Sequence, residues 1–371
     1  MTSAAGQQSK RLRSLACTIV SVCAIAAAAQ SQVSVEELFQ LLTVALALGY
    51  DDEATAHELG NIKLRERLGD EPIAVLKNEG LGPLALRALT ILREKSADLE
   101  SPAQSIASTQ PEPTASEREE LLRKVFEYAH SYGRRLPDFL CTETTRFYES
   151  GHQTVNRGSS RKVKKAGAWR LDQTVTEEVS FYQGRENYKT KLVNGQPNSQ
   201  AISEIRAWFT RGEFGTVLAM TFAPSSQAQF KWDHWEMLHK ERLAVFTFYV
   251  TRDHSHYEVC CVSTGTLTVG GVRKKRFRRW VSAYRGLVYV DPHTGIIARF
   301  TYQNVDIPSW VDLDGAGNLL DYSPTTIGDQ SYWLPGKAVH YTTIGNFRTR
   351  HETEFSNYRK FKADSTITFP N

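Results

Sequence analysis

The chain has 371 residues, a net charge of +4, 41% hydrophobic residues and a mean hydropathy of −0.40. This composition is that of an ordinary globular protein, and it excludes the disordered, collagenous and multi-span membrane classes. The net charge is too small to indicate a nucleic-acid partner. At about 150 residues per domain, a chain of this length is expected to form two domains.

Residues 1–31 have the layout of a secretory signal peptide. A basic stretch with Lys10, Arg11 and Arg13 precedes the apolar run 15–29, which ends in three alanines. Small side chains at this place are what signal peptidase requires, and the run is short for a membrane span. We therefore expect cleavage between residues 29 and 31 and a mature chain in the periplasm or outside the cell. Retention of the segment as an uncleaved anchor is the alternative.

Three cysteines remain after the signal segment: Cys141, Cys260 and Cys261. In an oxidising compartment we expect one disulfide, between Cys141 and Cys260 or its neighbour. Adjacent residues of a strand face opposite sides, so only one of the pair can meet a given partner. The alternative is three buried thiols that act as small apolar residues. The sequence contains no C-x-x-C, which argues against a redox-active or zinc-knuckle motif.

Residues 33–100 are predicted to form a small acidic helical domain, with 13 acidic and seven basic residues. Ser34 and Glu37 have the spacing of a capping box before an apolar periodic segment. Glycines and prolines separate the expected helices 35–47, 52–59, 71–77 and 83–95. Residues 101–117 are rich in serine and proline and are expected to be an extended linker. A domain of this kind binds proteins or acts as a spacer.

Residues 118–371 are predicted to form an antiparallel β-domain with two helices. A capping box at Ser116 and Glu119 opens an amphipathic helix that Pro137 ends, and a second helical segment is expected at 203–221. Period-two alternation predicts the strands 139–150, 168–181, 186–194, 230–238, 243–251, 257–268, 283–290, 296–304, 331–334, 337–344 and 348–362. About eleven such strands have to curl rather than stay flat. The expected fold class is α+β, a curved half-barrel with covering helices.

The segment 280–302 (WVSAYRGLVYVDPHTGIIARFTY) is a strand, a V-D-P-x-T-G turn and a return strand with an Arg-aromatic pair. It resembles the hairpin of periplasmic carriers with the lipoprotein-localisation (LolA-like) fold, a half-open barrel with helices on its concave side. Residues 118–371 also resemble a group of secreted bacterial proteins of acidobacterial type. That resemblance rests on the segments 136–141 (LPDFLC), 284–295 and 358–361 (YRKF). The likeness to the LolA-like fold implies a cavity suited to an acyl chain or another apolar ligand, and neither resemblance supplies a catalytic residue.

The familiar catalytic signatures are missing from the sequence. It contains no P-loop, no G-x-S-x-G and no H-E-x-x-H, because His57 and Glu58 are followed by Asn61 where a second histidine is needed. Asp233, His234, Glu236 and His239 form a polar group, but His239 does not share the strand face of His234 and Glu236. We therefore predict no catalytic residue, no metal site and no cofactor.

A basic patch is the one surface site that the sequence predicts. Six of the seven residues 273–279 are cationic: Arg273, Lys274, Lys275, Arg276, Arg278 and Arg279. Such a run binds anionic lipid head groups with about 1 kcal/mol per charge near the surface. The alternative is a solvated loop or edge strand whose charges discourage aggregation.

These features predict an exported, non-catalytic binding protein that holds a lipid, an acyl chain or a lipoprotein in a half-barrel cavity. The expected partners are that apolar ligand and an anionic membrane surface, without nucleic acid. The residues that contact the ligand are not predicted. An envelope scaffold or sensor and an unrecognised hydrolase are the alternatives. An apolar cavity would favour the carrier, a filled core the scaffold, and convergent titratable groups inside the barrel the hydrolase.

Overall fold

The computed structural model of this chain describes residues 32–47, 52–78, 80–102, 111–151, 153–157, 161–165, 169–205, 211–238, 241–269, 272–311, 313–344 and 347–361. Within the strands 153–157, 161–165, 260–269 and 272–278, only the backbone is described. The predicted signal peptide lies outside the described residues. In the part of the chain that the structure covers, no helix combines the length and the hydropathy needed to cross a bilayer.

Four helices form in the first part of the described chain: α1 (Val35–Ala47), α2 (Asp52–Asn61), α3 (Asp70–Asn78) and α4 (Pro83–Lys95). Their leucines share a buried core of their own, which includes Leu38, Leu42 and Leu89. The carboxylate of Asp52 accepts the backbone N–H groups of Leu84 and Ala85 at 2.8 and 2.7 Å. These are donors that the first turn of a helix leaves without intrahelical partners. These four helices lie within two residues of the bounds predicted from the sequence.

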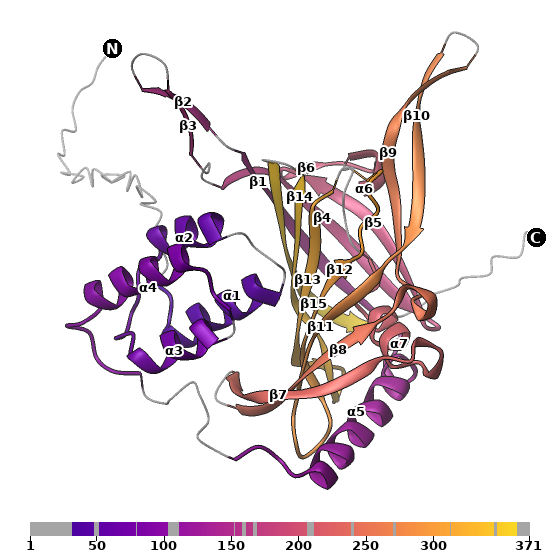
Figure 1. The fold of residues 1–371 in the computed structure, drawn as a ribbon. Coiled ribbons are helices and arrows are strands. Elements are labelled where there is room, and N and C mark those ends of the chain that lie inside the picture. Colours follow the sequence, from indigo (N-terminus) through magenta and orange to yellow (C-terminus); the bar gives the residue numbers. More distant parts are fainter. Residues whose placement is uncertain are drawn as a thin grey trace, which may run out of the picture. The chain divides into compact units, whose positions relative to one another are not determined.

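Eleven strands form one open antiparallel sheet in the order β6-β5-β4-β1-β15-β14-β13-β12-β11-β8-β7 (Figure 1). Their bounds are β1 (Phe139–Gly151), β4 (Arg170–Tyr182), β5 (Arg185–Val193), β6 (Gln196–Pro197), β7 (Gln229–Leu238), β8 (Glu241–Val250), β11 (Ala283–Val290), β12 (Ile297–Val305), β13 (Gly315–Ile327), β14 (Gln330–Ile344) and β15 (Phe347–Lys360). The end strands β6 and β7 do not pair with each other, so the sheet curves without closing. Two separate ribbons pair β2 (Gln153–Arg157) with β3 (Arg161–Lys165) and β9 (Glu258–Val269) with β10 (Val272–Val281).

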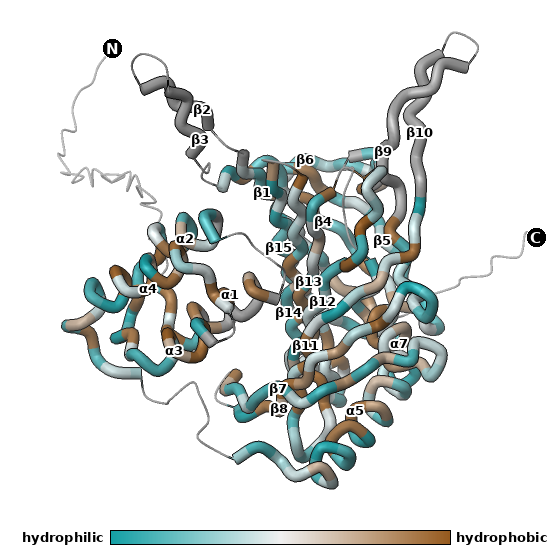
Figure 2. Tube along the Cα trace, in the orientation of Figure 1, coloured by the Kyte–Doolittle hydropathy of each residue, from teal (hydrophilic) through white to brown (hydrophobic). Residues whose placement is uncertain are grey.

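Three helices accompany the sheet: α5 (Ala115–Arg135), α6 (Ile202–Ile205) and α7 (Thr216–Phe222). The buried stripe of α5 includes Leu121, Val125 and Tyr132, and it joins one large apolar core with α7 and the strands. Figure 2 shows apolar and polar residues following one another along the strands, as expected when one face of a sheet is covered. The predicted α+β half-barrel with covering helices is confirmed.

Strand β13 is the main element that the sequence pattern missed. Its first residues are rich in glycine, aspartate and asparagine, which are residue types that favour turns. The structure pairs this segment with β12 on one side and β14 on the other. Pro324 is tolerated because β12 pairs only with residues 317–321, so Pro324 needs no second neighbour. Similarly, residues 331–334 and 337–344 form one strand, with a register shift opposite Pro335.

Candidate functional site

The apolar part of the sheet's inner face is filled by side chains. Phe248 and Phe300 stack with ring centroids 4.9 Å apart, and Phe222 of α7 packs on Phe230 at 5.0 Å. Tyr284, which is fully buried, shares a hydroxyl contact of 3.2 Å with Thr221 of α7. Dense packing of this kind leaves helices and strands little room for a ligand between them. This part of the inner face is therefore packed with side chains, whereas a carrier is expected to have a wide apolar cavity there.

An open groove of about 490 Å³ runs along one side of α5. Its lining residues are Tyr128, Tyr132, Arg135, Leu136, Thr294, Ile296, Ser331, Tyr332 and Trp333. Arg135 is the only charged residue among them. It is exposed, and its guanidinium carbon lies 4.9 Å from the ring centroid of Tyr128. The groove thus combines an aromatic and aliphatic wall with one cation, and its volume falls within the usual range for small-molecule sites.

A second groove, of about 510 Å³, lies on the other side of α5 and is more polar. His130, Arg134, Asp138 and Glu186 are among its lining residues, together with Phe214. One oxygen of Glu186 accepts the backbone N–H of Gly212 at 3.2 Å and the hydroxyl proton of Tyr188. Glu186 therefore connects the groove with a group of charged side chains on the inner face of the sheet.

Buried charges gather on the inner face where β1, β4 and β5 lie side by side. Arg211, between α6 and α7, places one guanidinium nitrogen 2.6 Å from Glu177 and another 3.4 Å from Glu143. Its guanidinium carbon lies 3.7 Å from the ring centroid of Tyr188, a cation–π geometry. Glu143 and Glu177 are 5% and 3% exposed. Two carboxylates and an aromatic face thus surround one guanidinium.

Two further carboxylates, Glu186 and Glu213, extend this group. Burial, followed by the charge of Glu213, raises the pKa of Glu143 to about 8. The same two causes, in the same order, raise the pKa of Glu186 to about 7. Four carboxylates and one arginine thus belong to this group; we call Glu143, Glu177, Glu186 and Glu213 the carboxylate cluster. Near neutral pH the cluster holds protons that exposed glutamates would have released.

Beside the carboxylate cluster, the inner face continues with hydroxyl and imidazole groups. Thr145 and Thr353 share a hydrogen bond of 2.8 Å, and His340 contacts the amide oxygen of Asn318 at 2.9 Å. Burial lowers the pKa of His340 to about 4, so this imidazole is neutral at physiological pH. The inner face thus has an apolar half under α5 and α7 and a polar half around β1, β15 and β14.

Sequence reasoning did not single out Glu143, Glu177 or Arg211. The period-two alternation was the signal that could have indicated the two glutamates. Glu143 lies on the same face of its strand as the apolar residue Cys141, and Glu177 lies on the same face as Val179. A glutamate at an inward position requires a partner, since an unpaired buried charge is costly. Arg211 is supplied by a loop distant in sequence, and no local pattern indicates it.

The polar group on β7 forms an ion network. His234 contacts Asp233 at 2.5 Å and Glu236 at 3.0 Å, as the shared strand face of His234 and Glu236 predicted. Burial opposes protonation of His234, but these two carboxylates raise its pKa to about 10. His239 lies outside the described residues. Among the residues that the structure describes, no three His, Cys, Asp or Glu side chains gather closely enough to hold a metal ion.

The predicted basic patch lies on β10, whose side chains from residue 273 to residue 278 are outside the described set. Its last member, Arg279, is described and forms an exposed ion pair of 3.0 Å with Glu258. The expected disulfide between Cys141 and Cys260 does not form, because Cys141 is a buried free thiol. Cys141 lies in the core on β1, whereas Cys260 belongs to β9, which pairs only with β10. The alternative of a buried reduced cysteine is correct for Cys141.

Comparison with known proteins gives fold likenesses only. No family model matches the chain, and no curated protein matches it significantly. Solved structures that match include a LolA superfamily protein from Nitrosomonas europaea, at 9% identity and a TM-score of 0.26, over 65% of this chain and 94% of the other. A putative outer membrane lipoprotein-sorting protein domain from Vibrio parahaemolyticus matches at 10% identity and a TM-score of 0.28, over 66% and 92%.

A DUF1329 family protein from Desulfovibrio piger also matches, at 10% identity and a TM-score of 0.28, over 69% of this chain and 96% of the other. One of these descriptions names the LolA superfamily, and another names lipoprotein sorting. At such low identities and TM-scores, the matches assign neither a ligand nor an activity to this chain. The strand order of this chain establishes the half-open sheet without these matches. The chemistry of the protein is therefore inferred from the two grooves and the carboxylate cluster.

Proposed function

We propose that this protein is an exported, non-catalytic binding protein whose ligand is an acyl chain with an anionic head group. The observation that carries the proposal is the 490 Å³ groove along α5, with Leu136, Ile296 and Trp333 in its wall and Arg135 as its only charge. Since the apolar inner face is filled, the ligand lies in this groove rather than deep in the half-barrel. An acyl chain would cover the apolar wall and gain about 25 cal/mol per Å² of apolar surface removed from water.

Arg135 selects the head group. It ends α5, and one guanidinium nitrogen donates to the backbone oxygen of Tyr128 at 3.3 Å, which leaves other donors of the group for a ligand. A carboxylate beside it forms a charge-assisted hydrogen bond, which is stronger than a neutral one. A fatty acid therefore fits this groove better than an uncharged lipid of the same length.

The test is displacement of a fluorescent fatty-acid probe from the full mature chain by palmitic acid and by hexadecanol. Arg135→Gln should weaken binding of palmitic acid by about tenfold and leave hexadecanol unchanged, because only the acid uses the charge. Arg134→Gln is the matched control, since the neighbouring Arg134 lines the other groove. Failure of palmitic acid to displace the probe, or equal effects of both variants, would refute the proposal.

The two alternatives each have one observation in their favour. The filled apolar interior suits a scaffold, which would bind no acyl probe at all. The convergence of Glu143 and Glu177 on Arg211 supplies the titratable groups that a hydrolase needs. Hydrolysis of ester or glycoside substrates that is lost in Glu177→Gln would favour the enzyme over the carrier.

Export and membrane contact are further proposals. Mass spectrometry of the secreted protein should find an N-terminus after a cleavage between residues 29 and 31, and an intact N-terminus would favour the anchor. For the basic patch, we propose contact with anionic lipid. Sedimentation with vesicles that contain phosphatidylserine should exceed that with phosphatidylcholine alone, and equal sedimentation would refute the contact.

A further inference from the structure

The carboxylate cluster has more negative charge than its arginine balances. Glu143, Glu177 and Glu213 are each at most 6% exposed, and Arg211 forms ion pairs with the first two. Removing a carboxylate from water without a partner costs several kcal/mol. The cluster therefore has to take up protons, a second cation or both.

Glu143 has an acceptor oxygen that no residue in the described part of the chain uses. Its Oε1 accepts hydrogen bonds from the hydroxyl of Thr145 at 3.3 Å and from the guanidinium of Arg211 at 3.4 Å. Its Oε2 is buried and has no hydrogen-bond partner. A buried oxygen without a donor is rare in folded proteins. It marks the place in the cluster where a donor is missing.

Glu213 is the neighbour whose charge acts most strongly on Glu143. Its carboxylate lies 3.4 Å from the hydroxyl of Tyr188, and the same hydroxyl also donates to Glu186. A phenol hydroxyl carries only one hydrogen, so Tyr188 cannot donate a full hydrogen bond to both carboxylates at once. Glu143 thus has one buried oxygen without a donor, and Glu213 shares its donor Tyr188 with Glu186.

The chemistry of the missing donor is indicated by the group already present. Arg211 shows that a planar cation fits between carboxylates and the face of Tyr188. In the described part of the chain, no three ligand side chains are grouped for a metal ion, and we take the donor to be an organic cation. Glu186 is the member of the carboxylate cluster that lines the 510 Å³ groove, together with Phe214.

We propose that Glu143 and Glu213 bind the ammonium or guanidinium group of a small organic cation, beside Arg211. The cation enters by the 510 Å³ groove, and its charge-assisted hydrogen bonds use the free Oε2 of Glu143. This site is separate from the acyl groove, which is lined by different residues of α5 and by the β11–β12 and β13–β14 turns.

Protons compete with this cation. Burial and Glu213 favour the protonated form of Glu143 by raising its pKa to about 8, and the cation binds the ionised form. The other groups that act on Glu143 are Arg211, which opposes the shift, and Glu177, which adds to it. Binding should therefore release protons near neutral pH and strengthen as the pH rises.

Calorimetry with agmatine, which carries an ammonium and a guanidinium, tests the site on the full mature chain. At about pH 8.5 we expect saturable binding that weakens at least about tenfold at pH 6, and release of about one proton per agmatine near pH 7.5. Butan-1-ol, an uncharged probe, should not bind. The absence of saturable agmatine binding at the higher pH, or binding without proton release, would overturn the proposal.

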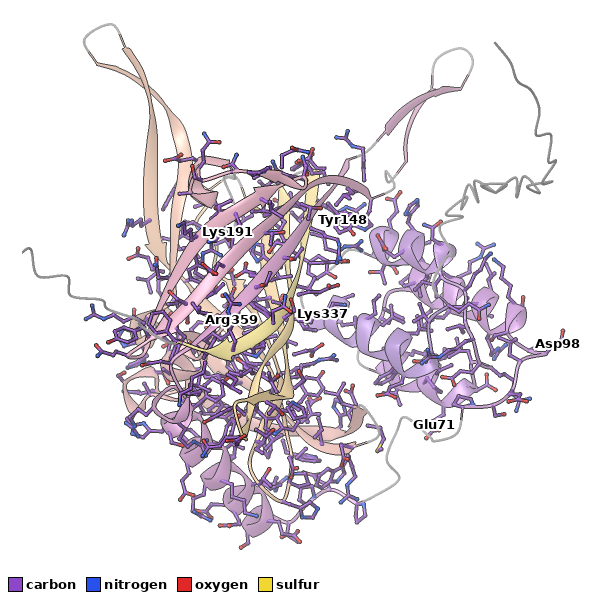
Figure 3. All side chains as sticks on the ribbon, turned by 180° about the vertical axis from the view of Figure 1, so that it is seen from behind. Glu71, Asp98, Tyr148, Lys191, Lys337 and Arg359 are labelled. Atoms are coloured by element: carbon purple, nitrogen blue, oxygen red, sulfur yellow. The ribbon has the colours of Figure 1, made fainter. Side chains whose placement is uncertain are left out.

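Variants locate the site. Glu143→Gln and Glu213→Gln should each weaken agmatine binding at least about tenfold, because each removes one of the two charges. Glu178→Gln is the control: Glu178 is on the opposite face of β4 and pairs with Lys191 and Arg359, both labelled in Figure 3. Equal agmatine binding by Glu178→Gln and Glu143→Gln would refute the assignment. Displacement of the fatty-acid probe by palmitic acid, measured on the same variants, should not change, which separates failure of this site from failure of the acyl groove.

Discussion

At the residue scale, Glu143 is the side chain that most constrains what this protein does. It stands on β1 between Cys141 and Thr145, among residues that face the covered side of the sheet. Its charge also acts on a neighbour, since burial of the Cys141 thiol, followed by the charge of Glu143, raises the pKa of that thiol. A thiol held in its neutral form is a poor nucleophile, so Cys141 acts as a core residue.

The same carboxyl gives the fold a pH dependence. The pKa of Glu143 is about 8 and that of Glu186 about 7, both above the ordinary value of 4.5, so the folded state holds protons that the unfolded chain releases. Their stabilisation is complete below pH 4.5 and is lost as the pH rises through 7 to 8. Between about pH 6 and pH 8.5, the wild-type chain should lose at least about 1.4 kcal/mol of unfolding free energy relative to Glu143→Gln.

Urea denaturation at both pH values measures this difference. His234 and His340 titrate in both proteins, so their contributions cancel in the comparison. Glu178→Gln is the control, because its hydrogen bond with Lys191 lowers the pKa of Glu178 and its titration falls below this range. A wild-type chain whose stability changes with pH as that of Glu143→Gln does would show that Glu143 is ionised throughout.

At the element scale, α5 is decisive because it borders both grooves and covers the apolar inner face. The sequence predicted its amphipathic stripe and its end before Pro137, but placed the capping box at Ser116 and Glu119. The structure has the box at Thr114 and Glu117, where the side chain of each residue bonds to the backbone N–H of the other. Both pairs have the same spacing, so the sequence alone does not distinguish them.

The cap can be tested by substitution. Thr114→Ala should lower the unfolding free energy by about 1 kcal/mol, because the N–H of Glu117 loses its acceptor. Ser116→Ala, inside the exposed first turn, is the matched control and should change stability by less than about 0.5 kcal/mol. Thermal or urea denaturation of both variants measures the two changes in unfolding free energy. A larger loss in Ser116→Ala than in Thr114→Ala would place the cap at Ser116.

At the scale of the whole molecule, we propose that the helices α1 to α4 and the sheet fold as separate domains. The core of α1 to α4 draws only on residues before residue 100, and the core of the sheet only on residues after residue 120. The predicted linker is shorter than expected, because its last residues belong to α5. The indole N–H of Trp235 also donates to the backbone oxygen of Pro111 at 3.0 Å, and we therefore propose that the β-domain begins near residue 111.

A fragment with residues 111–371 should therefore fold alone. We expect a cooperative urea transition and the same displacement of the fatty-acid probe by palmitic acid as in the mature chain, since both grooves lie in this part. A fragment that starts at residue 118 is the control, and it should be less stable because it lacks Thr114 and Glu117. An unfolded 111–371 fragment would contradict the division into domains.

The sequence by itself determined the elements whose signal is local. Period-two alternation predicted β1, β4, β8, β11 and β12 to within two residues, and apolar periodicity with glycine and proline breaks predicted α1 to α5. Only the tertiary structure decided that β13 is a strand, that Cys141 is a free thiol, and that Arg211 meets Glu143 and Glu177. The physical reason is distance along the chain. A side chain's own neighbours set its face and period, but its partner across the sheet is chosen by packing between strands and loops far apart in sequence.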